Sequence, residues 1–209
     1  MQGHSLIAPV IVDRQGMPTA DPATTWITLA SMLSVTDLVV AADHLILTPP
    51  FGGTGRPFTT RERLQAAVEA HPVAGMPRAR TALDLVRPGA ESRTETLLRL
   101  LLRDHGLPEP TVNPTVEVRT LDGRFRIVRL DLAFCRWKVA VEYDGDHHRT
   151  DARQYELDIA RYDDITADGW IDIRVRSYGL FVEPLVTLAR VHRALRSRGW
   201  RPSHRTRAR

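Results

Sequence analysis

Acidic side chains interrupt an otherwise apolar run in the second half of the chain, and this feature constrains the fold most. The run covers residues 130–144 and reads Leu-Asp-Leu-Ala-Phe-Cys-Arg-Trp-Lys-Val-Ala-Val-Glu-Tyr-Asp. Alternate residues of a β-strand share one face, about 6 to 7 Å apart, so Glu142 and Asp144 project together. Val141 and Tyr143 then project to the opposite face. The pattern predicts a strand with one apolar face and one acidic face.

The position of Asp131 depends on the turn between two predicted strands, residues 125–134 and 137–143. A two-residue turn at 135–136 places Asp131 diagonal to Glu142 on the same face. A turn two residues longer sets Asp131 directly opposite Glu142, whereas a three-residue turn separates them. Two of the three registers therefore bring the acids together.

Three carboxylates held together repel one another unless a cation lies among them, either a metal ion or an arginine. Hard oxygen ligands suit Mg2+ or Mn2+, and such an ion activates water and neutralises a phosphoryl group. We therefore expect Asp131, Glu142 and Asp144 to be metal ligands and catalytic residues of an endonuclease that hydrolyses DNA. His147 and His148 follow the strand, and His148 is the favoured assisting residue.

Each of these signals has a structural alternative. Arg129 on the facing strand could pair with either acid and make a salt-bridged sheet face. Glu95 stands at the third position of a capping box, which accounts for it without a catalytic role. Asp158 and Arg161 are three residues apart on a predicted helix, so they could form a surface pair. Arg161 could instead orient a site acid or steer a phosphate.

In the first part of the chain, periodicity and punctuation predict a hairpin or an edge ribbon within about 18 residues and then helices. The expected helix caps are Asp21, Thr36 and Thr59. The predicted helices cover residues 21–33, 36–46, 59–70 and 78–86.

The second part alternates helices and strands. A helix at 93–103 opens on Ser92 and Glu95, and a Pro-rich link follows at 108–114. The next elements are predicted to be strands 115–120, 125–134 and 137–143 in an antiparallel meander, helix 151–167, strand 171–175 and helix 184–198. Trp170 at the last helix-to-strand junction is expected to anchor the core. This order indicates an α/β sandwich around one mixed sheet.

We therefore expect a mainly helical module at residues 1–88, an α/β domain at 89–200 and a basic tail at 201–209. The 29 Lys and Arg residues against 25 Asp and Glu give a net charge of +4, which is compatible with a polyanionic partner without requiring one. The single Cys135 excludes an intramolecular disulfide and favours a reducing compartment, so a cytoplasmic location is expected. Neither early apolar stretch has the features of a signal peptide or membrane span.

The ordered motifs of the second half resemble the very-short-patch-repair-endonuclease-like domain of unknown function, in the PD-(D/E)XK nuclease superfamily and common in actinobacteria. The resemblance covers about residues 90–200. It is carried by Leu-Asp-Leu-Ala at 130–133, Val-Glu-Tyr-Asp-Gly at 141–145, His148, Asp158 with Arg161, and Gly169-Trp170 before Arg174.

This resemblance implies a restriction-endonuclease-like α-β-β-β-α-β-α core with a Mg2+ or Mn2+ site. It assigns Asp131 and Glu142 as metal ligands and Glu95 as a helix-borne catalytic acid. Asp144 stands where the superfamily usually has a lysine, which keeps a second possibility open, a catalytically inactive DNA-binding module. Arg161 and Arg174 are the expected nucleic-acid contacts.

Domains of this kind resemble the C-terminal part of AbiEi-type antitoxins of phage-defence systems, and residues 15–88 resemble their middle segment. The resemblance implies an antitoxin-like role as a further alternative, with a toxin protein as partner. No winged helix, with which those longer proteins begin, is recognisable in this sequence.

Overall fold

The computed structural model describes residues 10–50, 52, 55–70, 74–145 and 152–202. The chain divides into two compact units, Met1–Thr96 and Leu97–Arg209, which we describe separately. Compactness alone does not define an independently folding domain. The domain boundary near residue 88 stays a prediction.

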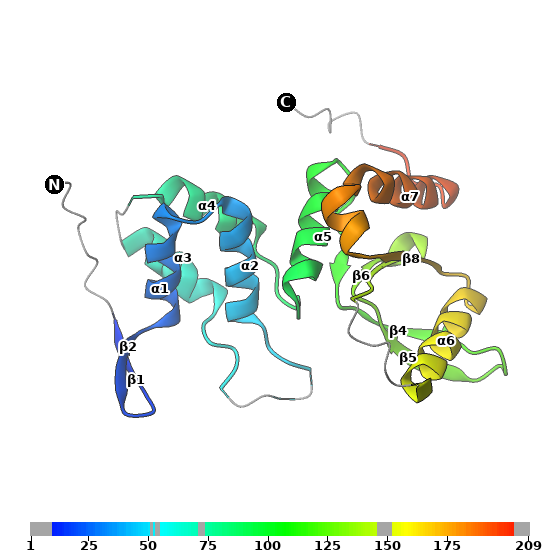
Figure 1. Ribbon diagram of the computed structural model, residues 1–209, viewed down its shortest axis with the longest axis horizontal. Coiled ribbons are helices and arrows are strands. Elements are labelled where there is room, and N and C mark those ends of the chain that lie inside the picture. The colour runs from blue at the N-terminus through cyan, green and yellow to red at the C-terminus, as the bar shows by residue number, and fades with distance from the viewer. Residues whose placement is uncertain (1–9, 51, 53–54, 71–73, 146–151, 203–209) are drawn as a thin grey trace. The chain divides into compact units, whose positions relative to one another are not determined.

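The first unit begins with a β-hairpin and continues with helices (Figure 1). The hairpin pairs β1 (Ile11–Arg14) with β2 (Met17–Ala20), as the sequence predicts. The helical elements are α1 (Pro22–Thr28), a 3-10 turn (Leu29–Ser31), α2 (Val35–Ile46), α3 (Arg61–Ala70), α4 (Met76–Leu85) and the first turn of α5 (Arg93–Asp104).

The starts of these helices confirm one predicted cap and correct two. Asp21 accepts hydrogen bonds from two backbone N–H groups of α1, as expected. Helix α2 is capped by Ser34, and Thr36 lies inside the helix, so the predicted cap was wrong. At α3 the hydroxyl of Thr60 accepts the capping bond, whereas the Thr59 hydroxyl is buried without a partner among the described residues.

A buried carboxylate joins two parts of the first unit. Asp43 of α2 is 1% exposed. One oxygen accepts a hydrogen bond from the backbone N–H of Arg87 at 2.7 Å, and the other accepts one from the hydroxyl of Thr96 at 3.0 Å. Because both oxygens have donors, the buried charge is compensated.

The second unit is an α/β structure with a mixed four-stranded sheet of order β3-β6-β7-β8. Strands β6 and β7 are antiparallel, and the edge strand β8 runs parallel to β7. Besides α5, its elements are β3 (Thr111–Val112), β4 (Thr115–Arg119), β5 (Phe125–Arg129), β6 (Leu132–Phe134), a 3-10 turn (Cys135–Trp137), β7 (Val139–Tyr143), α6 (Ala152–Ala167), β8 (Ile171–Val175), a π-helical turn (Tyr178–Val182) and α7 (Pro184–Ser197).

The predicted three-stranded meander is only partly correct. Strands β4 and β5 form a separate two-stranded ribbon. The expected continuous strand 125–134 breaks at Leu130 and Asp131, where the backbone bonds instead to Pro114 and Asn113. Part of the supposed Pro-rich link therefore becomes β3, which pairs with β6.

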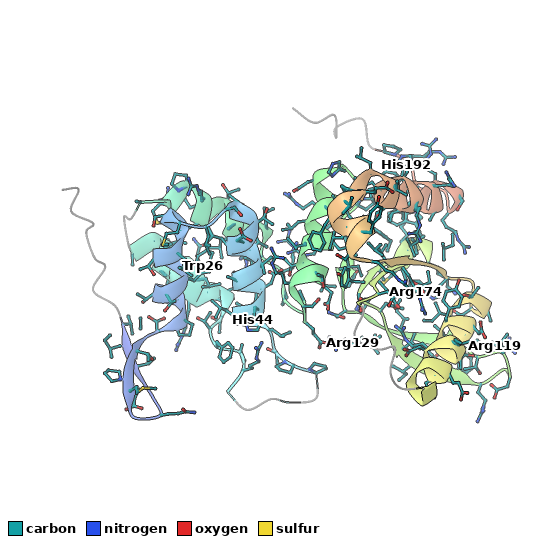
Figure 2. All side chains as sticks on the ribbon, viewed as in Figure 1. Trp26, His44, Arg119, Arg129, Arg174 and His192 are labelled. Carbon is teal, nitrogen blue, oxygen red and sulfur yellow. The ribbon has the colours of Figure 1, made fainter. Side chains whose placement is uncertain are left out.

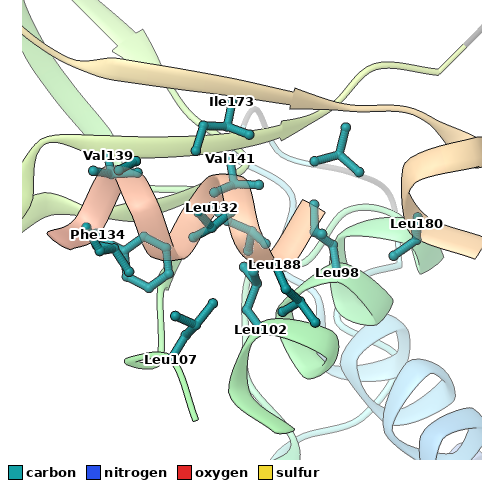
Figure 3. Packing of buried hydrophobic residues seen from close by; sticks show 14 residues of the cluster. Leu98, Leu102, Leu107, Leu132, Phe134, Val139, Val141, Ile173, Leu180 and Leu188 are labelled. Carbon is teal, nitrogen blue, oxygen red and sulfur yellow. The ribbon is translucent and has the colours of Figure 1, made fainter. Parts of the chain in front are cut away.

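The sheet has two differently covered faces. Helices α5 and α7 cover one face, where Leu98 and Leu102 pack with Val139, Val141 and residues of α7 (Figure 3). Helix α6 and the β4–β5 ribbon cover the other face, where a smaller apolar cluster includes Ala140, Ile165 and Trp170. Trp170 is 6% exposed, which confirms its predicted role as a core anchor. The second face also carries the charged residues.

Among the described residues, no helix combines the length and apolar character needed to cross a membrane.

Candidate functional site

The turn between β6 and β7 brings Asp131 beside Glu142. Phe134 pairs with Val139, so the turn covers residues 135–138 and is two residues longer than the shortest predicted turn. Continuing this register by one pair beyond β6 sets Asp131 opposite Glu142. The Asp131 carboxylate accepts a hydrogen bond at 2.9 Å from the backbone N–H that follows Glu142. The two acids therefore lie next to each other.

An unusual backbone conformation closes this turn. Lys138 has a φ of 50°, in the left-handed region that non-glycine residues seldom adopt. Its Nζ donates to both the side chain and the backbone carbonyl of Asp168, each at 2.8 Å. The Lys138 hydrogen bond is also the main reason why the pKa of Asp168 is lowered. These contacts hold the Lys138 side chain in place at the end of the turn.

Glu142 forms a two-pronged ion pair with an arginine of α6. Both its oxygens accept hydrogen bonds from Arg161, at 2.6 and 3.1 Å. The same guanidinium donates to the backbone carbonyl of Arg129. Glu142 is only 8% exposed, so this pairing compensates a charge that water cannot reach freely. Arg161 is therefore an arginine in direct contact with one of the predicted site acids, and its functional role stays a prediction.

Arg161 interacts electrostatically with three carboxylates. Burial disfavours its charged form, but the hydrogen bonds and charge of Glu142, together with the charges of Asp172 and Asp131, raise its pKa. A cation therefore lies among clustered acids, as their mutual repulsion requires. The acids that act on this arginine are Asp131, Glu142 and Asp172.

The sequence interpretation missed Asp172. Its side chain is 1% exposed, and Oδ1 has no hydrogen-bond partner among the described residues. Burial, reinforced by the charge of Glu142, raises the pKa of Asp172 to about 6, although Arg174 and Arg161 oppose the shift. A signal was present, because Asp172 stands between two isoleucines of a predicted strand.

Asp144, the third predicted acid, forms an ion pair of its own. Its carboxylate lies 2.9 Å from the Arg176 guanidinium, and its side chain is 31% exposed. In the described part of the chain, no group of three or more His, Cys, Asp or Glu side chains is arranged to hold a metal ion. The metal role of Asp144 stays a prediction.

Glu95 belongs to the first unit and forms the predicted capping box. The Ser92 hydroxyl accepts from the Glu95 backbone at 3.1 Å and donates to its Oε1 at 2.8 Å. Oε2 accepts from the backbone N–H of Glu91 at 2.9 Å. These bonds account for its position at the start of α5, and its catalytic role stays a prediction.

Arg174 lies on β8 and faces α6 (Figure 2). Its guanidinium stacks over the Tyr162 ring at 5.0 Å, and its Nε lies 3.4 Å from Asp172 Oδ2. Arg174 pairs in register with Glu142, so it belongs to the same charged face. The predicted assisting residue His148, its neighbour His147 and most of the basic tail lie outside the described residues.

No protein-family model, curated protein or solved structure matches the chain.

Proposed function

We propose that the second unit is a divalent-metal-dependent endonuclease that hydrolyses DNA phosphodiester bonds on a restriction-endonuclease-like core. The observation that carries this proposal is the placement of Asp131 beside Glu142 on adjacent strands. The element order α5, strands, α6, β8 and α7 supports the proposed core. The raised pKa of Asp172 in the same cluster is typical of functional sites.

The donor chemistry fits Mg2+ or Mn2+. Magnesium is commonly held by one or two carboxylates, with waters and substrate phosphates completing its shell. Asp131 and Glu142 would hold the ion, and no third carboxylate is required. The buried Oδ1 of Asp172, which has no hydrogen-bond partner in the described part of the chain, adds an acceptor to the same charged face. The ion would activate water and neutralise charge on the phosphoryl group.

The protein side chains have separate tasks in this proposal. The backbone bond to Asp131 and the Arg161 contact to Glu142 hold the two carboxylates in position. Arg161 keeps a positive charge beside the acids, which favours the approach of a phosphate. Arg174, half-exposed at the edge of this face, is placed to attract the DNA backbone.

Cleavage of supercoiled plasmid DNA with Mg2+ or Mn2+ tests the proposal. We expect nicking that Asp131→Ala lowers by at least about 100-fold, since loss of a metal ligand removes the activated water. Calorimetry should show metal binding that the same variant loses. Asp163→Ala, which removes an exposed acid of α6, is the matched control and should keep both. Absence of metal binding and of nicking in the unaltered protein would contradict the proposal.

The Arg161 ion pair favours a second candidate, a non-catalytic DNA-binding or antitoxin-like module. In this case the guanidinium permanently replaces a metal as the cation among the acids. The module would bind DNA in a salt-sensitive manner, and Asp131→Ala would leave this binding unchanged. Cleavage that depends on Asp131 would exclude this candidate.

A further inference from the structure

A pocket at the free edge of the sheet combines cationic side chains with a buried acid. It has a volume of about 280 Å³ and is lined by Ile159 and Tyr162 of α6, Asp172 and Arg174 of β8, and Arg190 of α7. Among the described residues, β8 is the last strand of the four-stranded sheet, so the pocket lies at a sheet edge. The two arginines supply positive charge from two different elements.

Contacts within the protein orient the two arginines. Arg174 is positioned by its contact with Tyr162 and by the Asp172 carboxylate. Arg190 donates from one terminal nitrogen to the Arg174 backbone carbonyl at 3.0 Å. Among the described residues, these are the polar contacts of the two guanidinium groups. Their remaining N–H groups can therefore bind an oxyanion, for which planar guanidinium donors are well suited.

Asp172 places a second requirement on the ligand, which must also carry a hydrogen-bond donor. Its side chain is almost fully buried and Oδ1 has no hydrogen-bond donor among the described residues, so a ligand reaches this oxygen only when the Asp172 side chain turns toward the pocket. A buried acceptor without a donor is costly, so a ligand that supplies an O–H group there would gain free energy. A simple inorganic anion offers negative charge but is a poor donor to a carboxylate.

We propose that this pocket binds a phosphate ester that also carries a hydroxyl group. The phosphate oxygens accept hydrogen bonds from Arg174 and Arg190, and the hydroxyl donates to Asp172 Oδ1. The pocket volume suits a phosphate with a few further atoms rather than a whole nucleotide, so the rest of the ligand projects outward. This chemistry is shared by a free sugar phosphate and by the end of a nucleic-acid strand. It does not require hydrolysis at Asp131 and Glu142.

Calorimetric titration of the full chain with two small probes tests this proposal. Glycerol 3-phosphate has both required groups, whereas ethyl phosphate lacks the hydroxyl. We expect glycerol 3-phosphate to bind at least about fivefold more tightly, since one additional hydrogen bond to a buried group contributes about 1 kcal/mol or more. Equal affinity for the two probes, or no binding of either at millimolar concentration, would overturn the proposal.

Variants separate the pocket from general charge attraction. Arg190→Gln should weaken glycerol 3-phosphate binding at least tenfold, and Arg193→Gln, which removes an exposed charge from the same helix, should change it less than twofold. Asp172→Ala should abolish the preference over ethyl phosphate. Equal losses in the two arginine variants would show nonspecific attraction and contradict the proposal.

Two further arms distinguish the ligand source and the proposed catalytic site. A 5′-phosphorylated single-stranded DNA eight-mer should bind more tightly than glycerol 3-phosphate, and Arg190→Gln should weaken its binding if the source is a nucleic-acid end. Binding of the small probe alone identifies a free sugar phosphate. Asp131→Ala should retain both interactions, so a failed nuclease proposal and a failed pocket are distinguishable.

Discussion

Two buried aspartates, one in each unit, are almost equally shielded from water and differ completely in their surroundings. Asp43 is 1% exposed, and both its oxygens accept hydrogen bonds from donors of the first unit. The Asp172 side chain is also 1% exposed, but one oxygen has no donor among the described residues and a second acid, Glu142, lies nearby. Burial alone therefore does not reveal the role of an acid.

The difference lies in what each carboxylate contributes to folding. Asp43 joins α2 to the segment before α5 and to the first turn of that helix, so its charge stabilises the first unit. Asp172 contributes less than its burial costs, as its raised pKa indicates. Such a group is typical of functional sites, and the edge pocket is the use that we propose for it.

Among these variants, replacement of Asp43 should change the free energy of unfolding most. Asp43→Ala leaves the Arg87 N–H and the Thr96 hydroxyl without their acceptor inside the first unit. We expect a loss of about 3 kcal/mol in the free energy of unfolding, measured by urea denaturation. Asp84→Ala, an exposed acid of α4, is the control and should change it by less than about 0.5 kcal/mol. Equally small changes in the free energy of unfolding of Asp43→Ala and Asp84→Ala would show that Asp43 does not stabilise the first unit.

Replacing Asp172, whose Oδ1 has no donor among the described residues, should instead raise the free energy of unfolding, and the gain should depend on pH. The pKa of Asp172 is raised from 3.8 to about 6 by burial and by Glu142. Its folded form binds a proton more readily than its unfolded form, so stability falls as pH rises from about 4 to 6. Asp172→Asn removes this loss and should stabilise the protein at pH 7 by on the order of 2 kcal/mol.

Urea denaturation of the unaltered protein and of Asp172→Asn at pH 4 and pH 7 measures this effect. The advantage of the variant should be present at pH 7 and largely absent at pH 4. Asp163→Asn removes an exposed charge from α6 and should change stability by less than about 0.5 kcal/mol. If Asp172→Asn lowers the free energy of unfolding at pH 7, the ionised Asp172 stabilises the fold, as Asp43 does, and the proposed difference between the two acids is wrong.

Glu95 extends the comparison to an acid whose donors are local. It is 8% exposed, and its contacts include the Ser92 hydroxyl and the Glu91 backbone. Ser92→Ala should lower stability by about 1 kcal/mol, the usual cost of losing a helix cap, measured by thermal or urea denaturation. Plasmid cleavage should persist in this variant. A collapse of cleavage without loss of stability would instead support a catalytic role for Glu95.

Local patterns predicted much of the fold. The first hairpin, the cap at Asp21, the capping box at Ser92 and strand 171–175 are set by residues close in sequence, and the structure confirms them. Errors arose at exact helix starts, as at α2, where Ser34 and not the predicted Thr36 is the cap. The break at Asp131 was missed because it depends on pairing with β3, a long-range contact without a local signal.

The site could be predicted only in part for the same reason. Strand alternation limited Asp131 and Glu142 to a few relative positions, and the 135–138 turn selected one of them. Spacing allowed Arg161 either a surface pair with Asp158 or a contact to a site acid, and the structure shows its guanidinium bonded to Glu142. The burial of Asp172 and its raised pKa could not be predicted from local sequence. They depend on the parallel pairing of β8 with β7 and on the packing of α6.

The turn at residues 135–138, in which Lys138 is left-handed, also fixes the alignment of β6 with β7. A register slip of two residues would keep Asp131 on the acidic face, because strand residues alternate in direction. A slip of one residue would bring an apolar neighbour opposite Glu142 and reverse the two faces of β6. The pairing of Phe134 with Val139 is therefore what keeps the two acids on one face.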